Sequence, residues 1–315
     1  MGETVVKYSH LSDMKIITLI FLVITLCAPL RAAEPAKTPP PPAESPAQAE
    51  LKTLVARQRE LLARADLAGS QAAVEALRPQ FQKLVNDYEQ YLKDYPSVAA
   101  GYASYAVLLG KPVLGERKRA AALMLKANEL DPGVPLVKNQ LGNWLAEEGR
   151  PLEAVNYFLA AVQLAPDEPL YHYQLGTLLT EARDEFVKSG AWTRAALDKA
   201  AQEAFRRAAE LAPERIEFTY RYGESFYDLE QPDWPAALGW WRGLEQRVKP
   251  GLERQTVRLH EANVLQKQGK FSEARALLAT VDEAALQKQK EKLAAQMPAE
   301  NLALPPLPRA GPVGR

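Results

Sequence analysis

Apolar residues recur at helical spacing through most of the chain, and turn-forming residues separate these stretches. Alternating β-branched runs and Asn-Gly hairpin turns are missing, so the pattern does not favour strands. Ala, Leu, Glu, Gln, Lys and Arg, which are good helix formers, dominate the composition. The sequence therefore predicts an all-α protein of helix hairpins laid side by side. The expected helices are 49–67, 70–94 with a break or kink near Pro79, 98–110, 116–130, 136–148, 151–164, 169–187, 192–211, 215–229, 234–247, 253–268 and 271–295.

The tripeptide Gln-Leu-Gly occurs twice, beginning at Gln140 and at Gln174. Leu141 and Leu175 are therefore 34 residues apart, an interval that indicates a repeated structural unit. In the unit from Pro135 to Glu168, small residues occupy positions where two helices can cross closely, and a large apolar residue lies beside them. These positions are Leu141, Gly142, Leu145, Ala154, Phe158, Ala161 and Pro166.

This combination of Leu-Gly on a first helix and of Ala, a large apolar residue, Ala and Pro on a second resembles the tetratricopeptide repeat (TPR). The same offsets recur in the units before and after it, and more weakly in two further units around 222–241 and 265–278. Pro166 and Pro213 are 47 residues apart, however, which indicates a 13-residue insertion near 181–200. The matching residues of the two neighbouring units are Ala120, Met124, Ala127, Pro132, Leu175, Gly176, Leu179, Ala201, Phe205, Ala208 and Pro213.

The resemblance implies a right-handed superhelical solenoid of antiparallel helix pairs, because a single unit cannot bury its apolar face alone. It also implies a concave groove, lined by first helices, that binds peptides or protein surfaces. Residues pointing away from the Leu-Gly packing face are the candidates for this groove, with ordinary solvated or packed positions as the alternative for each. The expected partner-binding residues are Asn139, Asn143, Tyr173, Thr177, Tyr220, Glu224 and Tyr227.

Two departures from the family's pattern affect these expectations. Some TPR proteins hold a peptide's C-terminal carboxylate with Lys, Asn and Arg side chains. Ala103 and Val107 occupy the corresponding positions of the first full unit and cannot make charged contacts, so we expect no such clamp. Glu261 stands where the last unit should have leucine, so the start of that unit deviates from the repeat.

The insertion is expected to lengthen both helices of the third unit, with a turn at Gly190. Divided over two helices it adds roughly 10 Å to each, at 1.5 Å per residue. Phe186 and Trp192 lie near its tip and permit two interpretations. They pack on each other, or they form a protruding ledge that contacts a partner or a second copy of the chain.

The ends of the chain differ from the helical part. Ile16 to Leu30 carries no charge, follows Lys15 and precedes small residues, which predicts a signal peptide over 1–33 with Met14 as a possible start. An uncleaved anchor is the alternative, although this stretch is shorter than the ~20 residues that span a bilayer. The remaining divisions are a proline-rich linker at 34–48, N-terminal helices with a degenerate leading repeat at 49–97, the TPR solenoid at 98–296 and a disordered proline-rich tail at 297–315.

Enzyme signatures are missing from the sequence. His172 and His260 have no catalytic or metal-ligand spacing around them, and no glycine-rich phosphate loop is present. Cys27, the only cysteine, lies within the predicted signal peptide. The 39 basic residues balance 39 acidic ones, which gives no support to a nucleic-acid partner.

We therefore expect a non-enzymatic scaffold or adaptor that binds a protein or peptide, with no catalytic residues, cofactor, metal or small-molecule substrate. The predicted signal peptide places it outside the cytoplasm, in the periplasm or secreted. Membrane contact is expected only if the N-terminal segment is retained. The alternative function is that of a self-associating structural component of the cell envelope.

Overall fold

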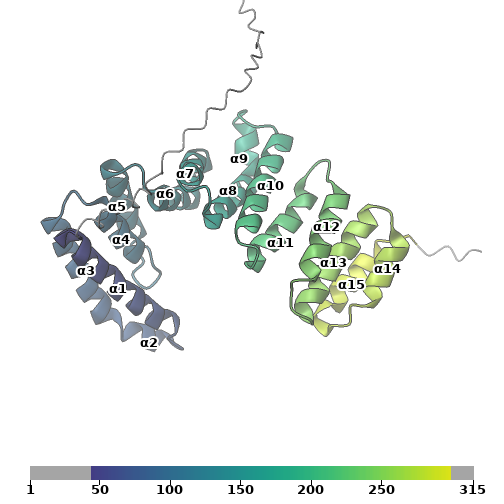
Figure 1. Cartoon of the computed structure of the whole chain (residues 1–315), viewed down its shortest axis with the longest axis horizontal. Coiled ribbons are helices and arrows are strands. Elements are labelled where there is room, and N and C mark those ends of the chain that lie inside the picture. Colours follow the sequence, from purple (N-terminus) through teal and green to yellow (C-terminus); the bar gives the residue numbers. More distant parts are fainter. Residues whose placement is uncertain (1–43, 299–315) are drawn as a thin grey trace, which may run out of the picture. The chain divides into compact units, whose positions relative to one another are not determined.

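The computed structural model describes residues 44–298, and every regular element within this range is a helix. The predicted signal peptide, most of the proline-rich linker and nearly all of the predicted C-terminal tail lie outside the described residues. The helices follow one another along the chain and are labelled in Figure 1. They are α1 (Pro46–Asp66), α2 (Gln71–Glu75), α3 (Arg78–Asp94), α4 (Ala99–Leu109), α5 (Arg117–Leu130), α6 (Pro135–Glu147), α7 (Pro151–Leu164), α8 (Pro169–Glu181), α9 (Arg183–Lys188), α10 (Arg194–Leu211), α11 (Ile216–Ser225), the 3-10 turn η1 (Phe226–Asp228), α12 (Trp234–Glu245), α13 (Leu252–Lys267), α14 (Phe271–Ala279), the 3-10 turn η2 (Ala284–Leu286) and α15 (Gln287–Ala295).

The first helix begins earlier than its apolar pattern indicates, at Pro46 inside the expected linker. Ser45 caps it: the Ser45 hydroxyl accepts from the backbone N–H of Gln48 at 3.2 Å, and the side-chain amide oxygen of Gln48 accepts from the backbone N–H of Ser45 at 2.9 Å. Such a capping box satisfies donors that a helix N-terminus otherwise leaves unpaired. The expected break near Pro79 is present, because α2 ends at Glu75 and α3 begins at Arg78.

From α4 onward the helices pack as pairs: α4 with α5, α6 with α7, α8 with α10, α11 with α12, and α13 with α14. The repeat residues form the contacts that the spacing predicts. Phe158 and Phe205 are almost fully buried, and each ring lies against the glycine of its own unit. A Cβ atom at Gly176 would lie 2.8 Å from the Phe205 ring, so only glycine permits this close approach.

The insertion has a different form from the one expected. The first helix of the third unit, α8, is no longer than α6, since both have 13 residues. The additional residues form the separate short helix α9, a turn at Gly190 with φ of +76°, and a longer α10 of 18 residues. The expectation that both helices would lengthen is therefore wrong for α8.

Contacts with the rest of the chain hold α9 in place. Phe186 is 1% exposed and belongs to the same hydrophobic core as Phe158, and α9 packs against α7 of the preceding unit. The Arg183 guanidinium lies 2.6 Å from the carboxylate of Asp198, which is buried in α10. Phe186 is thus a core residue and is not available to an external partner, whereas Trp192 is half-buried against the same core.

The C-terminal segment predicted as one helix, 271–295, is divided into α14 and α15. Val281 is fully buried in the connection, and the side-chain amide oxygen of Gln255 accepts from the backbone N–H groups of Asp282 and Glu283, both at 2.8 Å. No glycine or proline marks this break in the sequence, so its cause is tertiary. Among the described residues, no helix has the length and apolar character needed to span a bilayer.

Candidate partner-binding surface

The predicted groove residue Asn139 does not reach the surface. It is 1% exposed, and neither its amide oxygen nor its amide nitrogen has a hydrogen-bond partner in the described chain. The side of α6 that carries Asn139 is covered by packed neighbours, so the expectation that this side chain faces a groove is corrected. It is a buried polar residue, which costs stability when left without a partner.

Tyr173 and Thr177 on α8 are half-buried and make contacts within the protein. The Tyr173 ring lies 4.7 Å from that of Phe218 and 5.8 Å from that of Phe205, measured between ring centroids. The Thr177 hydroxyl donates to the Tyr173 carbonyl at 2.9 Å. Tyr173 therefore joins α8 to α10 and α11.

Tyr220 and Tyr227 connect the fourth unit to the fifth. The Tyr220 hydroxyl donates to the Glu253 carbonyl at 3.2 Å, and the Tyr227 hydroxyl donates to the His260 carbonyl at 3.3 Å. Burial raises the pKa of Tyr220 to about 12 and also raises the pKa of Tyr227, so both phenols remain protonated donors. Glu224, by contrast, is exposed, and its carboxylate forms no hydrogen bond or ion pair with another described residue.

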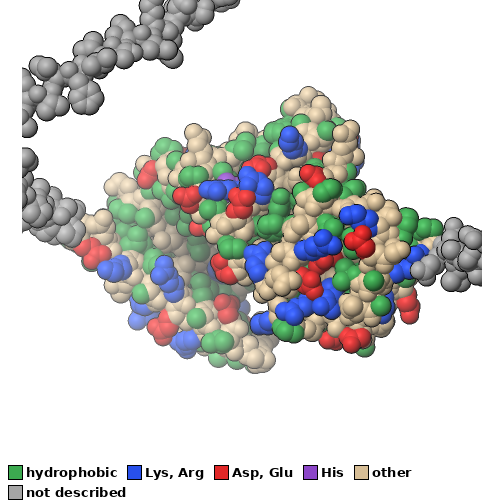
Figure 2. Space-filling view, turned by 45° about the vertical axis from the view of Figure 1, so that its right-hand side comes forward, with side chains coloured by type: hydrophobic (Ala, Val, Ile, Leu, Met, Phe, Trp, Pro, Cys, Tyr) green, Lys and Arg blue, Asp and Glu red, His purple; other side chains and the backbone are tan. Residues whose placement is uncertain are grey.

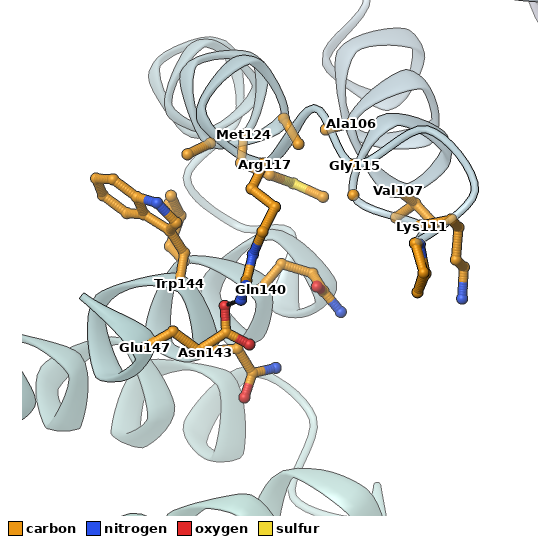
Figure 3. Close-up of a pocket in the computed structure, with 15 residues that line it drawn as sticks. Ala106, Val107, Lys111, Gly115, Arg117, Met124, Gln140, Asn143, Trp144 and Glu147 are labelled. Atoms are coloured by element: carbon orange, nitrogen blue, oxygen red, sulfur yellow. Dashed lines mark ion pairs between the residues drawn. The ribbon is translucent and has the colours of Figure 1, made fainter. Parts of the chain in front are cut away.

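Asn143 is the predicted residue that lines a cleft. This cleft has a volume of about 490 Å³ and lies between α4, α5, α6 and the connection from α4 to α5 (Figure 3). Its walls combine small and apolar side chains with a polar rim. They comprise Ala106, Val107, Gly110, Lys111, Pro112, Gly115, Arg117, Ala120, Ala121, Met124, Gln140, Leu141, Asn143, Trp144 and Glu147.

The first helices α4 and α6 both line the cleft and have no direct polar link. Within residues 44–298 no hydrogen bond or ion pair links these two helices, in contrast to the tyrosine bonds between the fourth and fifth units. The connection from α4 to α5 folds into one wall of the cleft. Gly115 adopts φ of +67°, and the N–H groups of Leu114 and Gly115 donate to the Lys111 carbonyl at 2.9 and 2.8 Å.

Apolar and polar groups meet inside this cleft. Met124 and Leu141 are buried beneath it, and the half-buried Trp144 forms one side. The side-chain amides of Gln140 and Asn143, one turn apart on α6, have no hydrogen-bond partner in the described part of the chain. Figure 3 shows Arg117 extending from α5 across the opening to form an ion pair with Glu147 on α6.

Sequence patterns alone did not identify Gln140, Trp144, Lys111 or Arg117 as site residues. Two signals pointed to this region: the connection between α4 and α5 is about two residues longer than the family's, and a tryptophan follows Asn143 directly. Neither signal shows that a cleft lies between α4 and α6.

A smaller cavity of about 300 Å³ lies between α13 and α15. His260 lines it and stacks on Trp241, with ring centroids 4.2 Å apart and planes within 8°. Burial lowers the pKa of His260 to about 4, so the imidazole is neutral at neutral pH. In the described ranges, no group of three or more His, Cys, Asp or Glu side chains is placed to hold a metal ion.

Charged side chains of both signs are interspersed over the face shown in Figure 2. Several form ion pairs along one helix, such as Arg206 with Glu203 and with Glu210 on α10. On this face such a surface provides no extended field of one sign for a large charged partner. The α4–α6 cleft combines a hollow with unpartnered polar groups and contains Asn143, a residue of the predicted set.

No protein-family model matches the sequence, and no curated protein is similar to it. Solved structures are similar in fold. YrrB, described as a TPR protein with an unusual peptide-binding site, is 20% identical, with 66% of this chain and 95% of that one covered at a TM-score of 0.52. PilF of Pseudomonas aeruginosa is 17% identical, with 79% of this chain and 99% of that one covered at a TM-score of 0.52.

These likenesses and the helix pairs described above define the class of the fold. It is an all-α, right-handed superhelical solenoid of antiparallel helix pairs of the TPR type, as the repeat spacing predicts. Proteins with this fold include scaffolds for protein interaction, but at these identities the comparison establishes the fold and leaves function to be argued from the site.

Proposed function

We propose that the protein is a non-enzymatic scaffold that binds a peptide or a segment of another protein in the α4–α6 cleft. The observation that carries this proposal is the gap between the two first helices, which uncovers Trp144 beside the unpartnered amides of Gln140 and Asn143. A polar amide left without a partner on a surface is available to a ligand's backbone, because it both donates and accepts.

The dimensions of the cleft suit an extended peptide. Gln140, Asn143 and Glu147 follow one another along α6 and cover about 10 Å at 1.5 Å per residue. An extended chain advances about 3.3 Å per residue, so about three peptide residues lie alongside this row. Trp144 and Met124 then accept an apolar side chain from the peptide, and a preformed site reduces the ordering cost of binding.

The remaining predicted groove residues contribute less to this proposal. Tyr173, Tyr220 and Tyr227 join neighbouring helices, and Asn139 is buried. Asn143 is thus the residue of the predicted set that we place in the binding site. YrrB, with its unusual peptide-binding site, supports peptide binding as a function that this fold accommodates.

We place this activity outside the cytoplasm, in the periplasm or secreted. The support is the uncharged segment from Ile16 to Leu30 and the small residues that follow it, which precede the described part of the chain. Mass spectrometry of the N-terminus of the protein purified from its native envelope tests this location. An intact N-terminus that starts at Met1 or Met14 would contradict cleavage and support an anchor.

Self-association as an envelope component is the second candidate. The observation in its favour is on α7, where Leu152, Leu159 and Leu164 are 46%, 45% and 43% exposed. Light scattering over a dilution series distinguishes the two candidates. A monomer at every concentration would exclude self-assembly, whereas a concentration-dependent dimer would support it.

The binding proposal is tested by selecting ligands for the full chain from a random peptide library and measuring their affinity by fluorescence anisotropy. Replacing Trp144 with alanine should weaken binding at least tenfold, since a contacting tryptophan is a typical hot spot. Trp192→Ala is the matched control, because Trp192 is also half-buried but lies on the insertion. Equal affinities for the two variants, at equal thermal stability, would show that the peptides bind elsewhere.

A further inference from the structure

The Arg117–Glu147 ion pair separates two hollows of the surface. On one side is the α4–α6 cleft of about 490 Å³, and on the other is a depression of about 520 Å³ formed by residues at the start of α5 and the end of α6. Gly115, Arg117 and Glu147 line both. The ion pair therefore lies between the two hollows and forms part of the wall of each.

Breaking this ion pair costs little free energy. The side chains of Arg117 and Glu147 are 62% and 54% exposed, and ion pairs at such exposure add little to stability, because water screens them and holding both chains costs entropy. A ligand that offers Arg117 a better-placed acceptor can therefore displace Glu147 at small cost.

The charges around the cleft favour an acidic ligand. Its lining carries three ionisable groups, those of Lys111, Arg117 and Glu147. Lys111 forms no ion pair or side-chain hydrogen bond with any described residue, so Glu147 is the acid that balances this rim. When Glu147 turns away, two cations face the cleft, and the planar guanidinium of Arg117 presents a fork that matches a carboxylate.

The apolar part of the site lies beside Arg117. Met124 is 5% exposed under the cleft and Trp144 stands beside Arg117 in Figure 3. A carboxylate on Arg117 and a large side chain on Trp144 therefore belong to neighbouring residues of one ligand. The unpartnered amides of Gln140 and Asn143 suit a peptide backbone between them.

We propose that the partner of the cleft is a peptide segment that carries an Asp or Glu side chain next to a large apolar residue, with its carboxylate replacing Glu147 on Arg117. This inference rests on the proposed function of the cleft and adds to it the chemistry of the ligand. Glu147 acts as an internal competitor: it occupies Arg117 in the free protein and is released when the partner binds.

If Glu147 competes with the ligand for Arg117, substitutions of the two residues should have different effects on binding, which a merely structural ion pair does not predict. Glu147→Gln and Arg117→Gln both abolish the pair, but they should change binding in opposite directions. Glu147→Gln should strengthen binding of selected acidic peptides by up to about fivefold, the factor that corresponds to an exposed pair of ~1 kcal/mol. Arg117→Gln should weaken it at least tenfold.

The experiment uses the full chain and peptides selected from the random library, measured by fluorescence anisotropy. Glu153→Gln is the matched control. The Glu153 side chain on α7 is 57% exposed, close to the 54% of Glu147, and it pairs with Arg150 just before that helix. Glu153 lines neither hollow. Replacing the peptide's acid with lysine should abolish binding to the natural chain and permit binding to Arg117→Glu.

The outcomes separate this inference from the function on which it rests. Two results would overturn the inference that the partner is acidic and leave peptide binding intact. The first is that the selected peptides depend on Trp144 but carry no Asp or Glu. The second is that Glu147→Gln binds acidic peptides with unchanged or lower affinity. A library that gives no peptide dependent on Trp144 overturns both.

Discussion

Glu261 allows a quantitative test of how the last helix pairs are packed. The repeat expects leucine at this position, yet the chain places a carboxyl group on α13 that is 3% exposed. The nearest cation, Arg242, is 3.8 Å away, and one carboxyl oxygen of Glu261 has no hydrogen-bond partner. Burial, with a smaller contribution from the nearby Glu245, raises the pKa of Glu261 from its usual 4.5 to about 7.

A raised carboxyl pKa destabilises the folded protein as the pH increases. Between pH 4.5 and 7 the folded chain binds the Glu261 proton while the unfolded chain has released it, so the free energy of unfolding falls across this window. A change from 4.5 to about 7 corresponds to ~3 kcal/mol. Arg242 is 56% exposed and 3.8 Å away, so its side chain can move toward the ionised carboxylate and offset part of this cost, and we expect a loss of ~1–2 kcal/mol.

His260, one residue earlier on α13, has the opposite effect. Its pKa is lowered by burial from 6.5 to about 4, so the unfolded chain binds more protons between these values and stability increases with pH. The two contributions oppose each other between pH 4.5 and 6.5. The natural chain alone therefore conceals the Glu261 contribution, and the test requires the difference between two chains.

We expect Glu261→Gln to match the natural chain in urea unfolding near pH 4, below the ordinary carboxyl pKa of 4.5, and to exceed it by ~1–2 kcal/mol at pH 8, since the amide resembles the protonated acid. Glu261→Leu restores the repeat residue and should be stabilising at both pH values, more so at pH 8. Glu273→Gln is the control, because Glu273 also lies near Arg242 but is 56% exposed. A stability difference between Glu261→Gln and the natural chain that does not change with pH would refute the argument.

Three further predictions concern packing, and each is measured by urea unfolding of the purified chain. Gly176→Ala should lower the free energy of unfolding by ~1–3 kcal/mol, because its Cβ would lie 2.8 Å from the Phe205 ring. Gly239→Ala, with no atom within 4 Å of the added Cβ, should raise it by ~0.5–1 kcal/mol. Equal effects would contradict the inference that Gly176 permits the close approach of Phe205. Phe186→Ala should cost ~3 kcal/mol or more, since the side chain is 1% exposed, and a loss under ~1 kcal/mol would show that α9 is not anchored. Tyr227→Phe should cost ~1 kcal/mol through the lost bond to the His260 carbonyl, and an unchanged stability would show that this bond contributes nothing.

The sequence predicts the helix pairs well because their contacts are local. Gly142 and Phe158 meet within one unit, and the periodicity of small and large residues directly encodes that crossing. The break between α14 and α15 was missed for the opposite reason. It depends on Gln255, which is remote in sequence and binds the backbone of Asp282, while the segment itself contains neither glycine nor proline.

Prediction of the site residues depended on how adjacent units are spaced, which the repeat pattern does not specify. The side chain of a tyrosine on a first helix, or directly after it, is long enough to reach the next first helix, as Tyr220 on α11 and Tyr227 in η1 do with the carbonyls of α13. A residue in a groove-facing position can therefore connect units and leave nothing for a ligand. Asn139 fails differently, because it is buried at that same kind of position.

Neighbouring units also differ in how their first helices are joined. Where tyrosines donate across a junction, as from α11 and η1 to α13, hydrogen bonds hold the first helices together. At the junction between α4 and α6, the repeat positions on α4 and at its C-terminal end that correspond to Tyr220 and Tyr227 hold Ala103 and Gly110, which have no side-chain group able to make such a bond. The junction is bridged instead by Arg117 and Glu147, two exposed side chains whose pairing contributes little. A ligand gains most at the junction where the protein has satisfied its own groups least, which is why we place the partner there.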